Sequence, residues 1–379
     1  MFVINTLGGN PPFFTPSNFD YMKSFILLIW IIFLFACTSK TIDGNIYFTE
    51  KDLPPVIELA GEKYSIPEIL NPRGLMIKDG LAIIFESKNT TDDKFHIIDL
   101  ETRRHLTSKG IDGLGPGEIT VISQIEDVGE VNKIWVEDPE MRIFSKFDLR
   151  DSSKLAEEQV KSPETMFFLT ASTWVSESTL LANMADGWDK YIHVTIEGDT
   201  LALFGNWKDM IANKELPNGY KEDELDANLV SNVFQGALKG SPDKKHYIKS
   251  GIHVDYIDII DLENYSIKTI YGPTREIPEF NIGYWDGYQM PDFGKNPNER
   301  YLDVYPGENS FFALFFGKTY KELGSPENLN RVFEFDYSGN ILNQYQLDFP
   351  VYGIEVDEKN RAIYAVTVDR DPNLVRFDY

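Results

Sequence analysis

The stretch Val332-Phe-Glu-Phe-Asp336-Tyr-Ser-Gly-Asn-Ile341-Leu-Asn-Gln-Tyr-Gln-Leu347 indicates the fold of this chain. Aromatic and β-branched residues lead into Asp336, a Ser-Gly-Asn turn follows, and a second apolar run begins at Ile341. Residues of this kind favour extended backbone, and Asp, Ser, Gly and Asn favour turns. The stretch therefore predicts two neighbouring antiparallel strands joined by a tight turn.

The same pattern of a strand closed by an Asp or Gly turn recurs along the chain. The turn positions are Asp99, Asp148, Gly198, Asp261, Asp336 and Asp378, at intervals of 49, 50, 63, 75 and 42 residues. A second pair of strands usually precedes the turn, as at Gly74–Phe85 and Gly353–Val366, so the repeating unit is a four-stranded meander. Repeats of this kind are typical of β-propellers, whose units span about 40 to 45 residues. We predict an all-β fold with six four-stranded blades over residues 54–379, and insertions near 208–230 and 276–300.

Closure of the ring requires a strand from the beginning of the chain. The last turn position, Asp378, lies one residue before the end, so the sixth blade lacks its outermost strand. Residues 37–53 are expected to form a tether and a closing-strand region, and Asp43–Leu59 is the predicted donor. Pairing the two ends of the chain in one blade removes an exposed strand edge.

The amino-terminal segment has the pattern of a signal peptide. Residues 25–36 form an unbroken apolar run of 12 residues, preceded by Met22-Lys23 and followed by Cys37. The run is too short to span a bilayer, and Leu34-Phe-Ala-Cys37 resembles a bacterial lipobox, in which the cysteine carries the lipid. We expect residues 22–36 to be the lipoprotein signal peptide and residues 1–21 to be an upstream extension that is not translated. The alternative is a buried helix with an incidental cysteine, and the start at Met1 or Met22 stays open.

The expected location follows from the same segment. Thr38, directly after Cys37, is the type of residue associated with sorting to the outer membrane. The sequence leaves open whether the head domain faces the periplasm or the cell surface. The expected attachment to the membrane is the lipid anchor on Cys37.

Composition excludes several classes of protein. The chain has 36 basic and 60 acidic residues, a net charge of −24 and a pI near 4.6, so a phosphate backbone would be repelled and nucleic acid is not expected as a partner. The single cysteine excludes a disulfide framework and any zinc site with more than one thiolate. The sequence has no motif for a metal site and we predict no cofactor, with calcium left open as an alternative that no motif supports.

A glycine-rich segment supplies a resemblance to a known family. It reads Gly113-Leu-Gly115-Pro116-Gly117-Glu118 and is followed by an apolar, strand-like run rather than a helix, which argues against a dinucleotide-binding loop. The glycines and the proline favour a tight connection between blades. Placed after a first blade and a lipobox, the segment resembles that of the TolB-like six-bladed propeller lipoproteins of Bacteroidetes, a family of largely uncharacterised function. The resemblance implies a lipid-anchored propeller and implies no chemistry.

Five residues are the candidates for ligand contact. Glu118 would lie near the channel mouth, and Trp285 and Tyr288 belong to an aromatic insertion suited to sugar stacking or peptide contact. His253 and Asp255 share one face of a strand. For each of them a purely structural role is the alternative.

Two functions are compatible with these features. The first is a lipid-anchored, monomeric propeller of the cell envelope that binds or scaffolds a protein or glycan partner. The second, less favoured, is a hydrolase or lyase with a metal or carboxylate site in the central channel, because the inner strands of such rings bring polar side chains to one axis. The fold alone does not decide between them.

Overall fold

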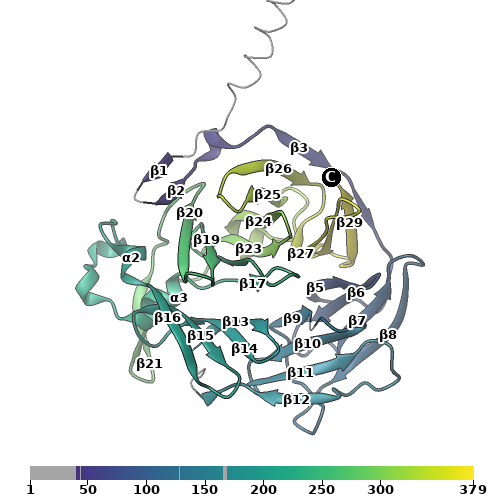
Figure 1. The fold of residues 1–379 in the computed structure, drawn as a ribbon. Coiled ribbons are helices and arrows are strands. Elements are labelled where there is room, and N and C mark those ends of the chain that lie inside the picture. Colours follow the sequence, from purple (N-terminus) through teal and green to yellow (C-terminus); the bar gives the residue numbers. More distant parts are fainter. Residues whose placement is uncertain (1–39, 43, 128, 165–168) are drawn as a thin grey trace, which may run out of the picture. The chain divides into compact units, whose positions relative to one another are not determined.

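The computed structural model describes residues 40–42, 44–127, 129–164 and 169–379 of the chain. Within them the strands form six sheets of four to six strands, and one separate two-stranded sheet. The six larger sheets follow one another around a central axis (Figure 1). This arrangement confirms the prediction of an all-β, six-bladed propeller.

Each blade is an antiparallel meander whose first strand lies nearest the axis. Blade 1 contains β5 (Pro72–Lys78), β6 (Leu81–Glu86), β7 (Asp93–Asp99) and β8 (Arg104–Ile111). Blade 2 contains β9 (Gln124–Asp127), β10 (Lys133–Asp138), β11 (Ile143–Asp148) and β12 (Glu158–Lys161). Blade 3 contains β13 (Leu169–Ser176), β14 (Thr179–Met184), β15 (Asp189–Thr195) and β16 (Thr200–Asn206).

The other three blades also receive strands from the amino-terminal part of the chain. Blade 4 contains β17 (Leu238–Gly240), β18 (Tyr247–Ser250), β19 (Tyr256–Asp261) and β20 (Ser266–Tyr271), with β2 (Asn45–Tyr47) and β1 (Lys40–Ile42) outside them. Blade 5 contains β23 (Asn298–Pro306), β24 (Ser310–Thr319), β25 (Arg331–Asp336) and β26 (Ile341–Leu347), with β3 (Val56–Leu59) outside them. Blade 6 contains β27 (Val351–Asp357), β28 (Ala362–Thr367), β29 (Leu374–Asp378) and β4 (Gly61–Lys63).

The recurring turn residues have a common position in the blades. Five of them are the last residue of the third strand of a blade, namely Asp99, Asp148, Asp261, Asp336 and Asp378. The carboxylate of Asp336, for example, accepts hydrogen bonds from the backbone N–H (2.8 Å) and the side-chain amide (2.9 Å) of Asn340. Such side-chain bonds stabilise the turn to the fourth strand, which explains why Asp marks this position.

The strand that closes the last blade differs from the predicted donor. Blade 6 is completed by Gly61–Lys63, which pairs antiparallel with β29, and not by Asp43–Leu59. That earlier segment instead supplies β2, parallel to β20, and β3, parallel to β26, along the outside of blades 4 and 5 (Figure 1). The chain therefore reaches blade 6 only at Gly61, where a Cβ atom would lie 2.6 Å from the Phe377 ring.

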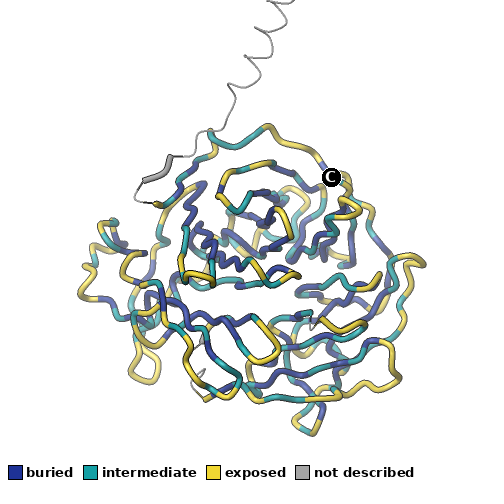
Figure 2. Tube along the Cα trace, viewed as in Figure 1, coloured by how far each residue is buried: buried dark blue, intermediate teal, exposed yellow. Residues whose placement is uncertain are grey.

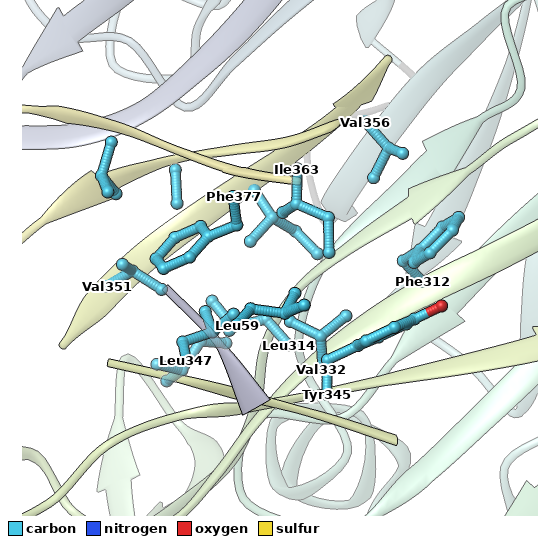
Figure 3. Close-up of a cluster of buried hydrophobic side chains, with 14 of the residues drawn as sticks. Leu59, Phe312, Leu314, Val332, Tyr345, Leu347, Val351, Val356, Ile363 and Phe377 are labelled. Atoms are coloured by element: carbon cyan, nitrogen blue, oxygen red, sulfur yellow. The ribbon is translucent and has the colours of Figure 1, made fainter. Parts of the chain in front are cut away.

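The hydrophobic core is divided among the contacts between blades. Six apolar clusters each join two neighbouring blades, and the one between blades 5 and 6 is drawn in Figure 3. The second strands β6 and β28 are buried at every residue, because both of their faces contact other blades. Exposed residues lie mainly on outer strands and connections (Figure 2).

Two long connections carry additional structure. Between β16 and β17 lie α2 (Lys208–Ile211), η3 (Pro217–Gly219), η4 (Glu222–Glu224) and α3 (Ala227–Val233). Between β20 and β23 lies the hairpin of β21 (Asn281–Trp285) and β22 (Tyr288–Asp292). Two shorter 3-10 helices are η1 (Glu50–Asp52) and η5 (Tyr320–Glu322). A seventh apolar cluster, which we call the insertion cluster, packs the helical connection and the base of the hairpin against blade 4.

Candidate functional site

One cavity occupies the end of the central channel where the inner strands begin. Its volume is about 440 Å³, and residues from all six blades line it. Many of the lining side chains are small or absent, which leaves the space open: Gly74, Ser123, Ala171, Ser172, Gly236, Ala237 and Gly353. We call this cavity the channel mouth.

Three charged side chains from consecutive blades meet at the inner strands. The Lys239 Nζ atom lies 2.8 Å from Oδ1 of Asp303 and 3.6 Å from Oε1 of Glu355. Asp303 also accepts a hydrogen bond from the Ile354 backbone N–H at 3.0 Å, which links blades 5 and 6. Burial raises the pKa of Glu355 to about 7, although Lys239 opposes this shift. The Glu355 carboxyl group can therefore gain or lose a proton near neutral pH.

A second carboxyl group lies between blades 2 and 3. Glu137 accepts hydrogen bonds from Ser172 Oγ (2.8 Å) and Ser123 Oγ (3.0 Å), and all three residues line the channel mouth. Burial raises the pKa of Glu137 to about 7, and the two hydroxyl groups act in the opposite direction. Glu137 can thus act as either a donor or an acceptor of hydrogen bonds at neutral pH.

A fixed positive charge lies at the rim of the cavity. Arg73 donates a hydrogen bond from Nη1 to the Tyr320 hydroxyl at 2.8 Å, and its guanidinium lies 5.4 Å from the centre of the Tyr352 ring. These contacts restrict the side chain, because the guanidinium is held both by a hydrogen bond and by a cation–π interaction.

The channel mouth can therefore recognise a polar molecule with both donors and acceptors. Donors are available from Lys239 and Arg73, and acceptors from Asp303 and Glu137. Among the described residues, no group of three or more His, Cys, Asp or Glu side chains is placed to hold a metal ion. Sequence reasoning missed these residues, because nothing distinguishes two channel carboxylates in a chain with 60 acidic residues.

The structure places Glu118 against its own loop. Its Oε2 atom accepts a hydrogen bond from the Gly115 N–H at 2.7 Å, and a Cβ atom on Gly113 would lie 2.0 Å from the same oxygen. Gly117 has a φ of 78° and donates to the Gln159 side chain. The glycines, together with Pro116, form a tight connection around the Glu118 carboxylate, which is not among the residues lining the channel mouth. Ligand contact by Glu118 stays a prediction.

His253 and Asp255 belong to different local contacts. Asp255 is fully buried and accepts hydrogen bonds from the Thr274 hydroxyl (2.8 Å) and the Arg275 N–H (2.8 Å), so it holds the connection after β20. The His253 ring packs 4.3 Å from the ring of Phe293, which follows the hairpin. Burial lowers the pKa of His253 and raises that of Asp255. Neither residue is among those that line the channel mouth.

The two aromatic candidates form one cross-strand pair. Trp285 lies opposite Tyr288 at the end of the hairpin, next to the Asp286-Gly287 turn. The exposed fractions are 72% for Trp285 and 40% for Tyr288, and Tyr284 beside them is 71% exposed. The insertion therefore presents aromatic side chains to solvent at its tip, while Phe280 at its base is buried.

The predicted leader and the lipidation residue Cys37 lie outside the described residues. In the part of the chain that the structure describes, no helix is long and apolar enough to cross a membrane.

Two solved structures from Bacteroides are among those that resemble this chain. The chain resembles a "Putative exported protein" from Bacteroides fragilis at 11% identity, with 87% of this chain and 98% of the other covered and a TM-score of 0.49. It also resembles a member of the DUF4221 family from Bacteroides vulgatus at 11% identity, with 84% and 97% covered and a TM-score of 0.51. No curated protein matches the sequence. The model of the TolB-like 6-blade propeller-like family matches residues 51–359, and the chain therefore belongs to that family.

Proposed function

We propose that this protein is a lipid-anchored propeller of the cell envelope that binds a polar protein or glycan ligand at the channel mouth. The observation that carries the proposal is the cavity of about 440 Å³, in which small side chains leave room and Lys239, Asp303 and Glu137 supply opposite kinds of hydrogen-bonding groups. Concave sites that combine open space with a few placed polar groups are typical of ligand binding.

We expect the segment 22–36 to direct export of the protein and a lipid to be attached to Cys37. We also expect the lipoprotein to be sorted to the outer membrane. The lipobox-like sequence supports this part of the proposal. Mass measurement of the protein made in a bacterial host that processes lipoproteins tests it directly. The expected mass corresponds to a chain that begins at Cys37 and carries lipid, and the Cys37→Ala variant should lack it.

Binding is tested by obstructing the cavity. Thr170 lines the channel mouth and is exposed, so Thr170→Trp should fill the opening, at the cost of the hydrogen bond from the Thr170 hydroxyl to Asn183 Oδ1 (3.1 Å). Thr200 is an exposed residue on the outer strand β16 of the same blade, and Thr200→Trp is the matched control. Glycan and peptide arrays probed with the three proteins should show a ligand class that binds the wild type and Thr200→Trp, but not Thr170→Trp.

Two results would contradict this role. One is binding that is unchanged in Thr170→Trp. The other is turnover of a small molecule that Glu137→Gln abolishes, because that result would favour a hydrolase or lyase using the channel carboxyl groups.

A further inference from the structure

The β21–β22 hairpin exposes three aromatic side chains around its turn. Tyr284, Trp285 and Tyr288 surround the turn at the tip, and the first two are more than two-thirds exposed. Because neighbouring strand residues point to opposite faces, Trp285 and Tyr288 lie on one face of the hairpin and Tyr284 on the other. The tip therefore offers aromatic surface on both sides rather than one flat platform.

The hairpin is held both next to its tip, through Gln289, and at its base, through Ile282. The Gln289 side chain accepts a hydrogen bond from the Asp226 N–H (3.0 Å) and donates to the Glu224 carbonyl (3.0 Å), and Asn228 donates to the Gln289 carbonyl (2.8 Å). Ile282 packs on the insertion cluster. The aromatic tip is thus presented by a fixed support, with little conformational entropy to lose on contact.

The first described residues of the chain adjoin the same blade. Lys40 pairs with Tyr47, and Tyr47 pairs in turn with Tyr271, the last residue of β20. Tyr47 also packs on the insertion cluster, as does Ile282 of the hairpin. The beginning of the described chain and the base of the hairpin therefore rest on one apolar cluster of blade 4.

The chain between the expected lipid and blade 4 is very short. Cys37 precedes Lys40 by three residues. Three residues span at most about 10 Å even when fully extended. A lipid on Cys37 would consequently keep Lys40 within about 10 Å of the lipid-bearing residue.

We infer that the tip of the hairpin is a second membrane contact, in which Trp285, Tyr284 and Tyr288 insert into the interface of the bilayer that holds the lipid on Cys37. Trp and Tyr favour this region, because their rings are apolar and their N–H and O–H groups stay hydrated. The inference rests on the proposed lipid anchor. Together, anchor and hairpin would fix the orientation of the propeller relative to the membrane.

The negative charge of the protein indicates which lipids the hairpin would contact. The turn residue Asp286 is exposed between Trp285 and Tyr288, and the whole chain carries −24. Anionic headgroups would repel this carboxylate. A bilayer of neutral lipid, such as phosphatidylethanolamine with phosphatidylcholine, is therefore the expected partner.

The test measures whether Trp285 enters lipid. The lipidated full-length protein is reconstituted in neutral vesicles that contain brominated lipid, which quenches tryptophan fluorescence at short range. The Trp285 signal is the difference between the wild type and Trp285→Phe. Trp188, which is partly buried against the insertion cluster, provides the matched control Trp188→Phe. We expect brominated lipid to quench most of the Trp285 fluorescence. The amount of fluorescence that brominated lipid quenches should be the same in Trp188→Phe as in the wild type.

The outcomes separate this inference from the anchor on which it rests. If mass measurement finds no lipid on Cys37, the anchor itself is wrong. If the protein is lipidated and bound to vesicles but Trp285 is not quenched, the anchor stands and the hairpin contact is refuted. Unlipidated protein whose Trp285 signal responds to a soluble glycan or peptide, and not to lipid, would also overturn the inference. Unchanged unfolding midpoints of both Phe variants show that the comparison is between folded proteins.

Discussion

One buried carboxylate, that of Asp258, lies in the contact between blades 3 and 4. Asp258 of β19 lies 2.5 Å from the Lys190 Nζ atom, and it accepts hydrogen bonds from the Tyr191 hydroxyl and from Thr269 Oγ1 at 2.7 Å. The exposed fraction is 0% for Asp258 and 2% for Lys190. Asp258→Asn removes the charge of this group while keeping its size.

A second buried lysine near Asp258 increases the loss of stability expected for Asp258→Asn. Lys249 is fully buried, and its hydrogen bonds go to the backbone carbonyls of Phe234 and Ser250. Burial lowers the pKa of Lys190, and burial holds the pKa of Lys249 well below its ordinary value. Without Asp258 the Lys190 ammonium loses its counter-charge in a region that water does not reach. Breaking a buried pair in this way destabilises a protein by about 3–5 kcal/mol.

Denaturant unfolding at pH 7 measures this loss. The matched control is Glu140→Gln, which breaks the exposed ion pair with Lys88 and should change the free energy of unfolding by no more than about 1 kcal/mol. The double variant Asp258→Asn with Lys190→Met should recover much of the stability, because it removes the stranded cation. If Asp258→Asn is no more destabilising than Glu140→Gln, the reasoning about this buried pair is refuted.

Three further substitutions test the closure, the channel and the glycine loop. Gly61→Val should destabilise the ring by about 1–3 kcal/mol in denaturant unfolding, because its side chain would collide with Phe377, and an unchanged midpoint would contradict closure by this strand. Burial raises the pKa of Glu137 from 4.5 to about 7, so the wild type should lose about 3 kcal/mol of stability as pH rises through that interval. Glu137→Gln should abolish this pH dependence, and retention of the full slope would assign it to another group. Glu118→Ala should lower stability by about 1–2 kcal/mol, since it leaves the Gly115 N–H without its acceptor, and should leave ligand binding at the channel mouth intact.

The repeated part of the fold could be predicted because it is encoded locally. A run such as Val332–Phe335 favours a strand, and Asp336 forms the turn with its own carboxylate, so neither depends on distant residues. Gly61–Lys63 has no such pattern, because glycine, glutamate and lysine do not favour a strand. It becomes one only by pairing with Val375–Phe377, which lies more than 300 residues later. The predicted closure was therefore right in principle and wrong in its donor.

The channel mouth could not be predicted for a different reason. Lys239, Asp303 and Glu355 come from three blades and meet only because the ring closes. The sequence instead drew attention to local features. Glu118 lies in a glycine-rich loop, where a side chain at Gly113 would collide with the Glu118 carboxylate. Trp285 directly precedes the turn residues Asp286 and Gly287.

Because the core is divided among the contacts between blades, residues of the channel mouth can be substituted with less effect on stability. Six apolar clusters hold neighbouring blades together, while many of the side chains that line the channel mouth are small or polar. Hydrophobic stabilisation follows the apolar area removed from water, so it resides mainly between the blades. Substitutions at the channel mouth, such as Thr170→Trp, should therefore alter binding with little loss of stability, whereas Asp258→Asn and Gly61→Val act on the contacts that hold the ring together.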